Sequence, residues 1–408
     1  MSRHLRNRSF SDDPFAVMTR PPPNESAEAK QRRQSEEQMA KQRSELIDEE
    51  IKRDRQARQQ AEATQRKLLL LVGQAESGKT TTLKQFQLLQ SESAFNAQLH
   101  SYRALIYLNV LNSLVFAFFS VFLRPTSLST SSRGPCYPTP PLASHPKVVY
   151  EVICMDWNSR DDPGRIFADC VDYLIALWED EAVQTALAKQ RPSIRESPGF
   201  FMDDLARVAA RGYMPSADDI LRARIKTLGV QEHRVRFDRG PDKGLEWIIF
   251  DVGGARSQRL RWAPYFQTVN AIIFLAPISP FNQTLAEDPR MNRVKDSLLL
   301  WQEICKNKVL KKVSIVLFLN KCDLLKAKLA SGVQFKKYMT SYKGPNEWAP
   351  VAEFLRSKFD DVYQANTPSK RSLYVHQTSV VDSRTTQRII QDVREQIMKD
   401  ALAAVGLY

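Results

Sequence analysis

The feature that most constrains this fold is a glycine-rich loop between an apolar segment and a helical one. Residues 73–80 read GQAESGKT and match the phosphate-binding pattern G-x-x-x-x-G-K-[ST]. The glycines let successive backbone N–H groups converge on phosphate oxygens, the lysine reaches the β and γ phosphates, and the final hydroxyl suits Mg²⁺. Residues 67–72 predict a buried strand and residues 80–89 a helix, which is the order that the pattern requires. The chain is therefore expected to bind a nucleoside triphosphate.

Composition excludes several other classes of protein. The 408 residues are 43% hydrophobic, which is enough for two domains with sizeable cores. The five cysteines lack C-x-x-C spacing and no signal peptide is recognised, so neither a disulfide framework nor a zinc site is predicted, and the compartment is expected to be reducing. The formal charge of +13 is spread along the chain among acidic residues, which favours a membrane surface weakly and no nucleic acid.

The N-terminal residues divide into two segments of different composition. Residues 1–25 combine arginine, serine and a proline run with few apolar side chains, which is typical of disorder. Residues 26–66 consist mainly of strong helix formers, with sparse apolar positions at Met39, Leu46 and Ile51. This segment is interpreted as a projecting helix. It either docks on a partner or stands alone in solvent.

Residues 104–123 carry no charge and are long enough for a helix to cross a bilayer. Asn109, Asn112 and Ser113 within the run, and the lack of a second span, favour a buried or partly buried helix of a soluble domain instead. Residues 125–146 are rich in Ser, Thr and Pro and are expected to be flexible. The stretch from about 116 to 150 is either a divergent insertion or an incorrectly translated gene segment.

The remaining sequence predicts an α/β fold interrupted by a helical module. Helical periodicity is found over residues 166–184 and 200–210. Strand patterns then alternate with helical ones, so we expect a mostly parallel sheet with helices on both faces and a ligand at the carboxyl ends of its strands. The expected strands are 233–238, 245–251, 271–276, 313–320 and 372–375, and the expected helices are 257–266, 292–306, 348–359 and 385–404.

Two further motifs follow predicted strands. Asp251 begins a D-x-x-G sequence that ends at Gly254. The aspartate can hold Mg²⁺ directly or through water, and the glycine N–H can reach a γ phosphate. Asn320, Lys321 and Asp323 form an N-K-x-D sequence, whose aspartate can accept hydrogen bonds from N1–H and the exocyclic amine of guanine. Adenine lacks this pair of donors, so the expected nucleotide is GTP or GDP.

Taken together, these motifs give the chain a resemblance to the α subunits of heterotrimeric G proteins, of a divergent fungal type. The resemblance extends over residues 35–408 and includes the sequences LWEDEAVQ at 177–184, FMDDL at 201–205, DILRARIKT at 219–227 and EDPRMNR at 287–293. It implies a Ras-like GTPase domain at 67–97 and 223–408 with an inserted all-α domain at 98–222. It also implies a βγ dimer bound to the helix at 26–66, a seven-helix receptor at the C-terminal helix, and an effector that the sequence does not identify.

The resemblance assigns roles to individual positions. Arg224 resembles the arginine that α subunits supply in cis to the transferring phosphoryl group, where a fixed guanidinium stabilises spreading negative charge. Thr80 and Thr227 resemble the Mg²⁺ ligands, with Asp251 acting through water. Glu196 is expected to approach the nucleotide from the helical domain. Further contacts to the nucleotide are expected from Gly73, Glu76, Ser77, Gly78, Lys79, Thr81, Ser197, Leu221, Arg222 and Val380.

Two departures from the family pattern concern catalysis. Ala255 follows Gly254 where the family has the glutamine that orients the attacking water, and a methyl group cannot take that role. Ala75 stands in the phosphate loop where the family typically has glycine, and its Cβ adds bulk close to that position. We therefore expect a GTPase with slow hydrolysis. A GTP-binding scaffold that has lost catalysis is the alternative, and a membrane-spanning GTP-binding protein is a further one.

Other departures concern the base and the membrane. Residues 378–381 alter the base-contacting loop, although the Val380 N–H could still reach the guanine oxygen. The N-terminal sequence lacks the glycine for myristoylation and any nearby cysteine for palmitoylation. The expected location is cytoplasmic and peripheral at the inner face of the plasma membrane, held by basic residues at the N-terminus or by a lipidated βγ partner. Val405 replaces the cysteine that toxins modify in some relatives, so that modification is expected to fail.

Overall fold

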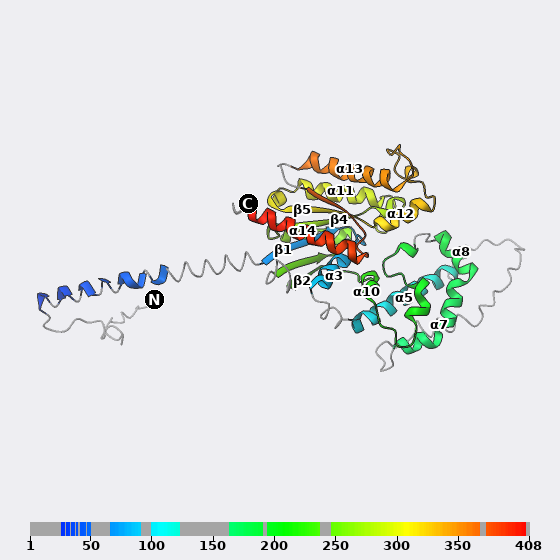
Figure 1. Cartoon of the computed structure of the whole chain (residues 1–408), viewed down its shortest axis with the longest axis horizontal. Coiled ribbons are helices and arrows are strands. Elements are labelled where there is room, and N and C mark those ends of the chain that lie inside the picture. Colours follow the sequence, from blue (N-terminus) through cyan, green and yellow to red (C-terminus); the bar gives the residue numbers. More distant parts are fainter. Residues whose placement is uncertain are drawn as a thin grey trace, which may run out of the picture. The chain divides into compact units, whose positions relative to one another are not determined.

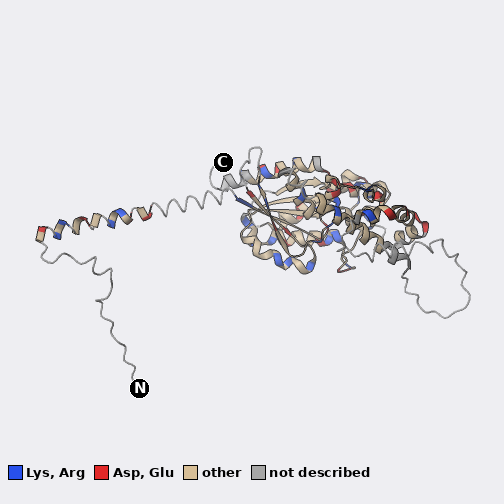
Figure 2. Ribbon diagram, turned by 90° about the horizontal axis from the view of Figure 1, so that it is seen from below, with Lys and Arg blue, Asp and Glu red and all other residues tan. Residues whose placement is uncertain are grey.

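The computed structural model describes residues 66–90, 99–122, 163–190, 194–236, 246–367 and 373–404, and most of 26–49. The chain forms two units, residues 1–65 and 66–408. In the first, the described residues from Ala27 to Glu49 are helical and exposed, and basic and acidic side chains alternate along them (Figure 2). This confirms the expected helix for that part of 26–66. The expectations for residues 1–25, for most of 116–150 and for Val405 lie outside the described residues.

The second unit is built on a six-stranded sheet (Figure 1). Its strand order is β2-β3-β1-β4-β5-β6. Strand β2 runs antiparallel to β3 and all the other neighbours are parallel, so the expectation of a mostly parallel sheet is confirmed. The strands are β1 (Arg66–Gly73), β2 (Val230–Arg236), β3 (Glu246–Val252), β4 (Ala271–Pro277), β5 (Ser314–Asn320) and β6 (Leu373–Thr378).

Both faces of the sheet are buried, which explains why its central strands are apolar runs rather than alternating patterns. On β1, Leu69 and Leu71 pack on one side with helices α3 and α14, whereas Leu70 and Val72 pack on the other side with α11, α12 and α13. Figure 1 shows these two helical layers. The helices are α3 (Lys79–Gln90), α11 (Arg293–Lys306), α12 (Cys322–Ala330), α13 (Trp348–Asn366) and α14 (Ser383–Ala404).

A separate apolar core lies among the helices of the inserted segment. These helices are α5 (Leu99–Phe122), α7 (Pro163–Glu179), α8 (Glu181–Gln190), α9 (Leu205–Val208) and α10 (Ala217–Arg222). The expected helix in the uncharged run is confirmed over residues 104–122, and Ile106, Val110 and Leu114 bury their side chains in this core. Among the described residues, no helix combines the length and apolar character needed to cross a membrane.

The structure differs from the sequence-based expectation in three places. Residues 256–267 form 3₁₀ turns rather than an α-helix, because Pro264 lacks the N–H that a regular helix needs. The helix expected at 200–210 is reduced to a 3₁₀ turn followed by α9. Helix α12 begins directly after the N-K-x-D lysine and was not expected. The other short 3₁₀ segments are Ile194–Glu196, Ser279–Asn282, Lys308–Lys312 and Phe335–Lys337.

Candidate functional site

A cavity of about 450 Å³ opens where the parallel strands end. The segments that follow β1, β3, β5 and β6 line one side of it, and residues of the inserted helical segment line the other. Of the site residues expected from the sequence, only Gly73 and Asp251 do not line it. Those that do are Glu76, Ser77, Gly78, Lys79, Thr80, Thr81, Glu196, Ser197, Leu221, Arg222, Arg224, Thr227, Gly254, Ala255, Asn320, Lys321, Asp323 and Val380.

The phosphate-loop backbone takes conformations that only glycine adopts without strain. Gly73 has a φ of 145° and Gly78 a φ of 105°. A Cβ on Gly78 would lie 2.4 Å from Nδ2 of Asn320, so the loop is also closely packed. Within it, the buried Lys79 donates hydrogen bonds to the carbonyls of Gly73 and Gln74, at 3.0 and 2.7 Å. Burial lowers the pKa of Lys79 to about 8. The loop therefore presents a preformed, glycine-dependent concavity with an ammonium group at its base.

Three oxygen-bearing side chains meet beside the loop. Thr80 Oγ1 donates to Asp251 Oδ2 at 2.6 Å, Thr227 Oγ1 donates to the same oxygen at 3.1 Å, and the two hydroxyl oxygens are 3.0 Å apart. Asp251 is fully buried, and its Oδ1 has no hydrogen-bond partner among the described residues. Hydroxyl and carboxylate oxygens are the ligands that Mg²⁺ takes, and a buried carboxylate oxygen without a partner suits a cation or its bound water. The donor set therefore fits Mg²⁺.

The D-x-x-G segment rests directly on the phosphate loop. A Cβ on Gly254 would lie 2.3 Å from the carbonyl carbon of Gln74 and 2.4 Å from the nitrogen of Ala75, so only glycine fits there. Ala255 follows and lines the cavity. Three residues later, Gln258 also lines the cavity and accepts a hydrogen bond from Gly229 N at 3.3 Å. The segment after β3 thus connects the loop with the residues around Thr227.

Arg224, the candidate catalytic arginine, is held through its side chain and through its backbone. Its guanidinium forms an ion pair with Glu76 at 2.9 Å, and Arg293 approaches the same carboxylate at 3.2 Å. Burial raises the pKa of Glu76, but Arg293 and Arg224 lower it more, so the net pKa is below its usual range. The side chain of Asn109, in α5, forms two hydrogen bonds with the backbone of Arg224: it donates to the carbonyl oxygen and accepts from the N–H. Glu76 stays ionised and fixes the guanidinium next to the phosphate loop.

At the other end of the cavity, Asn320 connects three segments. Its Nδ2 donates to Ser77 O at 2.7 Å, while its Oδ1 accepts from Thr378 Oγ1 at 3.1 Å and Val380 N at 3.2 Å. The Val380 N–H that was expected to reach a guanine oxygen is thus directed at Asn320 in this structure. Lys321 has a left-handed φ of 67°, and burial lowers its pKa to about 8. Asp323 lies in the first turn of α12 and lines the cavity.

Contacts between the helical segment and the sheet domain close one side of the cavity. Glu196 forms an ion pair with Lys328 of α12 at 2.7 Å and accepts a hydrogen bond from Gln283 at 3.0 Å. Arg222, by contrast, directs its guanidinium toward Asp204, at 2.8 Å, within the helical segment. Leu221 contributes its carbonyl, which accepts a hydrogen bond from Thr81 at 3.4 Å.

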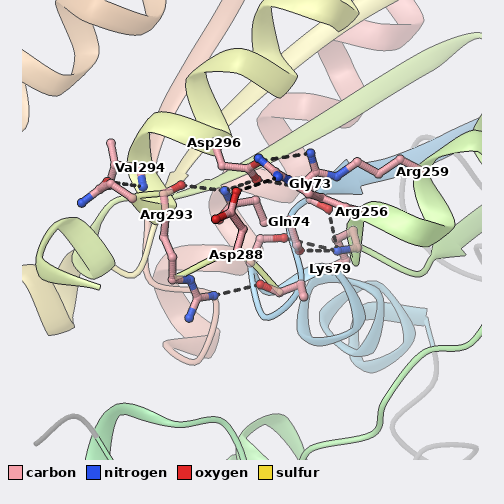
Figure 3. A network of polar contacts seen from close by, with 12 residues as sticks. Gly73, Gln74, Lys79, Arg256, Arg259, Asp288, Arg293, Val294 and Asp296 are labelled. Carbon is pink, nitrogen blue, oxygen red and sulfur yellow. Dashed lines mark hydrogen bonds and ion pairs between the residues drawn. The ribbon is translucent and has the colours of Figure 1, made fainter. Parts of the chain in front are cut away.

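Several residues of the site carried no sequence signal. Gln74 occupies a variable position of the loop pattern, yet it is buried and bonded to Asp296 and to the backbone of Arg293 (Figure 3). From the sequence, Asn109 was interpreted only as a polar residue that makes a membrane-spanning helix unfavourable. An alternating or helical pattern does not predict such contacts, because their partners come from distant parts of the chain. The order of the motifs along the chain indicated only that the motif residues themselves would meet.

Comparisons with known proteins agree with this geometry. A profile of the G-protein alpha subunit family matches residues 41–397. The chain is 31% identical over 375 residues to the guanine nucleotide-binding protein G(o) subunit alpha of Planorbella trivolvis, covering 92% of this chain and 98% of that protein. It is 32% identical over 376 residues to the protein of the same name from Locusta migratoria, with the same coverage. The chain therefore belongs to the G-protein alpha subunit family, the signal-transducing GTPases that bind guanine nucleotide and Mg²⁺.

Proposed function

We propose that this chain is a GTP/GDP switch that couples a seven-helix receptor to an effector through a βγ dimer, and that it hydrolyses GTP slowly. The observation that carries the proposal is the pairing of an intact triphosphate site with Ala255 at its catalytic position. The phosphate loop, the three oxygen-bearing side chains and Arg224 all line or adjoin the cavity. Ala255 also lines it, and its side chain is only a methyl group.

Each part of the cavity has a proposed role in holding the nucleotide. The loop N–H groups and Lys79 would hold the phosphates, and the Gly254 N–H would donate to a γ phosphate. Thr80 and Thr227 hold Mg²⁺, with Asp251 contributing through water. When bound, the ion offsets negative charge on the phosphate oxygens. Asp323 accepts hydrogen bonds from the guanine edge, which selects GTP over ATP.

The proposed catalytic contribution of the protein is electrostatic. Arg224 lies next to the loop through its ion pair with Glu76, so its guanidinium is positioned to stabilise charge that develops on the phosphoryl oxygens. In G-protein α subunits a glutamine after the second glycine orients the attacking water, which is a property of the family rather than of this structure. Ala255 has neither a donor nor an acceptor on its side chain. The expected consequence is a longer lifetime of the GTP-bound state.

The proposed partners bind the first and the last helix of the chain. The charged helix between residues 26 and 66 is proposed to bind the βγ dimer, and α14 to engage the receptor. Attachment is proposed to be peripheral, at the inner face of the plasma membrane, through βγ and basic residues. Such attachment weakens as ionic strength rises, because salt screens the attraction between basic residues and anionic lipid.

Single-turnover GTP hydrolysis tests the proposal. The wild-type chain is compared with Ala255→Gln, with Arg224→Ala, and with Ser257→Ala as a control at an exposed position of the same segment. We expect Ala255→Gln to hydrolyse at least about ten-fold faster than wild type, since positioning the nucleophile lowers the barrier. Arg224→Ala should be slower than wild type. Equal rates for wild type and Ala255→Gln would contradict slow hydrolysis through Ala255. Binding without turnover in all the variants would favour the scaffold that has lost catalysis.

A further inference from the structure

Gln258 lies one turn beyond Ala255 in the segment that follows Gly254. Its backbone N–H donates to the carbonyl of Ala255 at 2.9 Å, at the start of the 3₁₀ segment Arg256–Gln267. In a 3₁₀ turn, residues three positions apart lie one above the other on the same side. Both residues line the cavity. The chain thus has a glutamine at the cavity wall, one turn away from the position where the family pattern has one.

The carboxamide of Gln258 is held between two segments of the site. Its Oε1 accepts a hydrogen bond from Gly229 N at 3.3 Å. A Cβ on Gly253 would overlap this Oε1 and would lie 3.1 Å from the carbonyl oxygen of Thr227. Gly253 N in turn donates to Gly229 O at 2.9 Å. The amide therefore lies beside the backbone of Thr227, a proposed Mg²⁺ ligand, and beside the residue that precedes Gly254.

The contact with Gly229 determines which groups of the amide remain available. The N–H of Gly229 needs an acceptor, so Oε1 of Gln258 faces it and the NH₂ group points elsewhere. This Nε2 has no hydrogen-bond partner among the described residues. An amide oxygen has two lone pairs, so Oε1 can accept a second hydrogen bond. Gln258 can therefore offer both an acceptor and N–H donors at the cavity.

Hydrolysis of GTP uses groups of these two kinds. The water oxygen bonds to the γ phosphorus, the bond from that phosphorus to the bridging oxygen breaks, and its electron pair stays with GDP. A water proton passes to the released phosphate. An acceptor orients the water through one of its protons, and a donor stabilises charge on the phosphoryl oxygens. A primary amide does both without gaining or losing a proton.

We propose that Gln258 orients the attacking water in place of the side chain missing at position 255, and that the slow hydrolysis of this chain depends on it. The inference rests on the proposed function, because it concerns GTP bound in this cavity. A side chain attached one turn further along, whose oxygen is shared with Gly229, places the water less closely than one attached next to Gly254. Small misplacements of a reacting group cost large factors in rate. Hydrolysis is therefore slow and still measurable.

Single-turnover hydrolysis by the full-length protein tests this role against a purely structural contact with Gly229. Each protein is loaded with GTP at low Mg²⁺, and the reaction is started with Mg²⁺. The variants are Gln258→Ala, Gln258→Glu, Ala255→Gln and the double variant Ala255→Gln/Gln258→Ala. Glutamate keeps an oxygen for Gly229 N, but it has no N–H donor and adds negative charge. Gln267→Ala is the matched control, because Gln267 is exposed at the end of the same 3₁₀ segment.

We expect Gln258→Ala and Gln258→Glu to hydrolyse GTP about ten-fold more slowly than wild type, as for the loss of a hydrogen bond to a charged group. Gln267→Ala should match wild type. In the Ala255→Gln background, Gln258→Ala should change the rate by less than about two-fold, because the glutamine at 255 then orients the water. A structural contact would cost the same factor in both backgrounds.

The outcomes separate this inference from the proposed function. If Gln258→Glu is as fast as wild type, or if Gln258→Ala costs the same factor in both backgrounds, the inference is wrong and slow hydrolysis stands. If wild type binds no guanine nucleotide, or binds GTP without turnover, the proposed function and the inference fail together. Binding of fluorescent GTPγS is measured on each variant first. If Gln258→Ala does not bind it, the rate of Gln258→Glu decides.

Discussion

Asn109 and Arg224 are joined by a reciprocal pair of hydrogen bonds, although they lie 115 residues apart in the chain. Arg224 N donates to Asn109 Oδ1 at 2.7 Å, and Asn109 Nδ2 donates to Arg224 O at 3.1 Å. A helix of the inserted segment thus orients the backbone of the residue that we propose to stabilise the transferring phosphoryl group. The side chain of Arg224 remains free to reach Glu76.

Replacing Asn109 with alanine should slow GTP hydrolysis. The change removes both hydrogen bonds, each contributing about 0.5–1.5 kcal/mol, so we expect a rate roughly ten-fold lower in single turnover. Affinity for GTPγS should change much less, because the phosphate loop is not altered. Asn112→Ala, an exposed asparagine of the same helix, is the control. A similar loss in both variants would show that α5 matters only for stability.

Gly254→Ala should weaken binding of GTPγS more than binding of GDP. A Cβ at this position would lie 2.3 Å from the carbonyl carbon of Gln74, so residue 254 must move away from the loop. The N–H that would donate to a γ phosphate then moves away, whereas the loop residues that would hold the β phosphate are unchanged. We expect a loss of about ten-fold or more in the ratio of the two affinities, equivalent to one missing charged hydrogen bond. Equal losses for both nucleotides would contradict this geometry.

Removal of Mg²⁺ with EDTA should lower the affinity for GTPγS in the wild-type chain. In Thr227→Ala the effect of EDTA should be smaller, because one of the three oxygen-bearing side chains that fit the ion is already missing. Titration with Mg²⁺, followed by nucleotide fluorescence, measures the difference. Thr268→Ala, an exposed threonine outside the site, serves as control. An unchanged Mg²⁺ requirement in Thr227→Ala would remove this residue from the metal site.

Glu196→Gln should accelerate release of GDP. The substitution removes the negative charge that pairs with Lys328 at 2.7 Å, and this ion pair holds the helical segment over the cavity. Lys328 is 5% exposed, so its unpaired charge would be costly. We expect release several-fold faster, measured by displacement of a fluorescent GDP analogue. Glu181→Gln at an exposed position of α8 should leave the rate unchanged.

Thiol labelling should distinguish the cysteines of the folded protein. Burial raises the pKa of Cys322 to about 12, and its thiol donates to Leu319 O at 3.2 Å. The thiolate is the reactive form, so raising the pH from about 7 to about 9 should increase alkylation in the unfolded chain, where a thiol titrates near 8.5, but not in the folded protein. Cys170 is partly exposed and should react. Rapid labelling of Cys322 in the folded chain would contradict its burial.

The architecture could be predicted from the sequence because its signals are local. Apolar runs such as residues 68–72 need burial on both sides, and the glycine pattern after β1 permits one kind of loop. The order of the motifs then indicated which strands end at the same edge of the sheet. This placed Lys79, Asp251 and Asp323 near one site. Lys79 and Asp323 line the cavity, and Asp251 lies behind it, where it accepts a hydrogen bond from the cavity-lining Thr80.

The contacts that refine the site could not be predicted in this way. Gln74 meets Asp296 only because β1 is central in the sheet and α11 packs beside it, which is a property of the tertiary structure. The contact of Asn109 could not be predicted either, because its partner Arg224 lies 115 residues further along the chain, just after the inserted segment. Residues 257–266 were expected to be α-helical because helical patterns alternate with strands along this part of the chain, yet the observed segment at 256–267, which contains Pro264, has 3₁₀ geometry.

Gly254 touches the phosphate loop through main-chain atoms, whereas positions 75 and 255 differ from the family pattern in their side chains. Under the proposed function, recognition of the nucleotide and the speed of its hydrolysis depend on different atoms. Single substitutions at positions 75 and 255 would then lengthen or shorten the cellular response. The residues that bind the nucleotide would stay the same while the duration of the response changed.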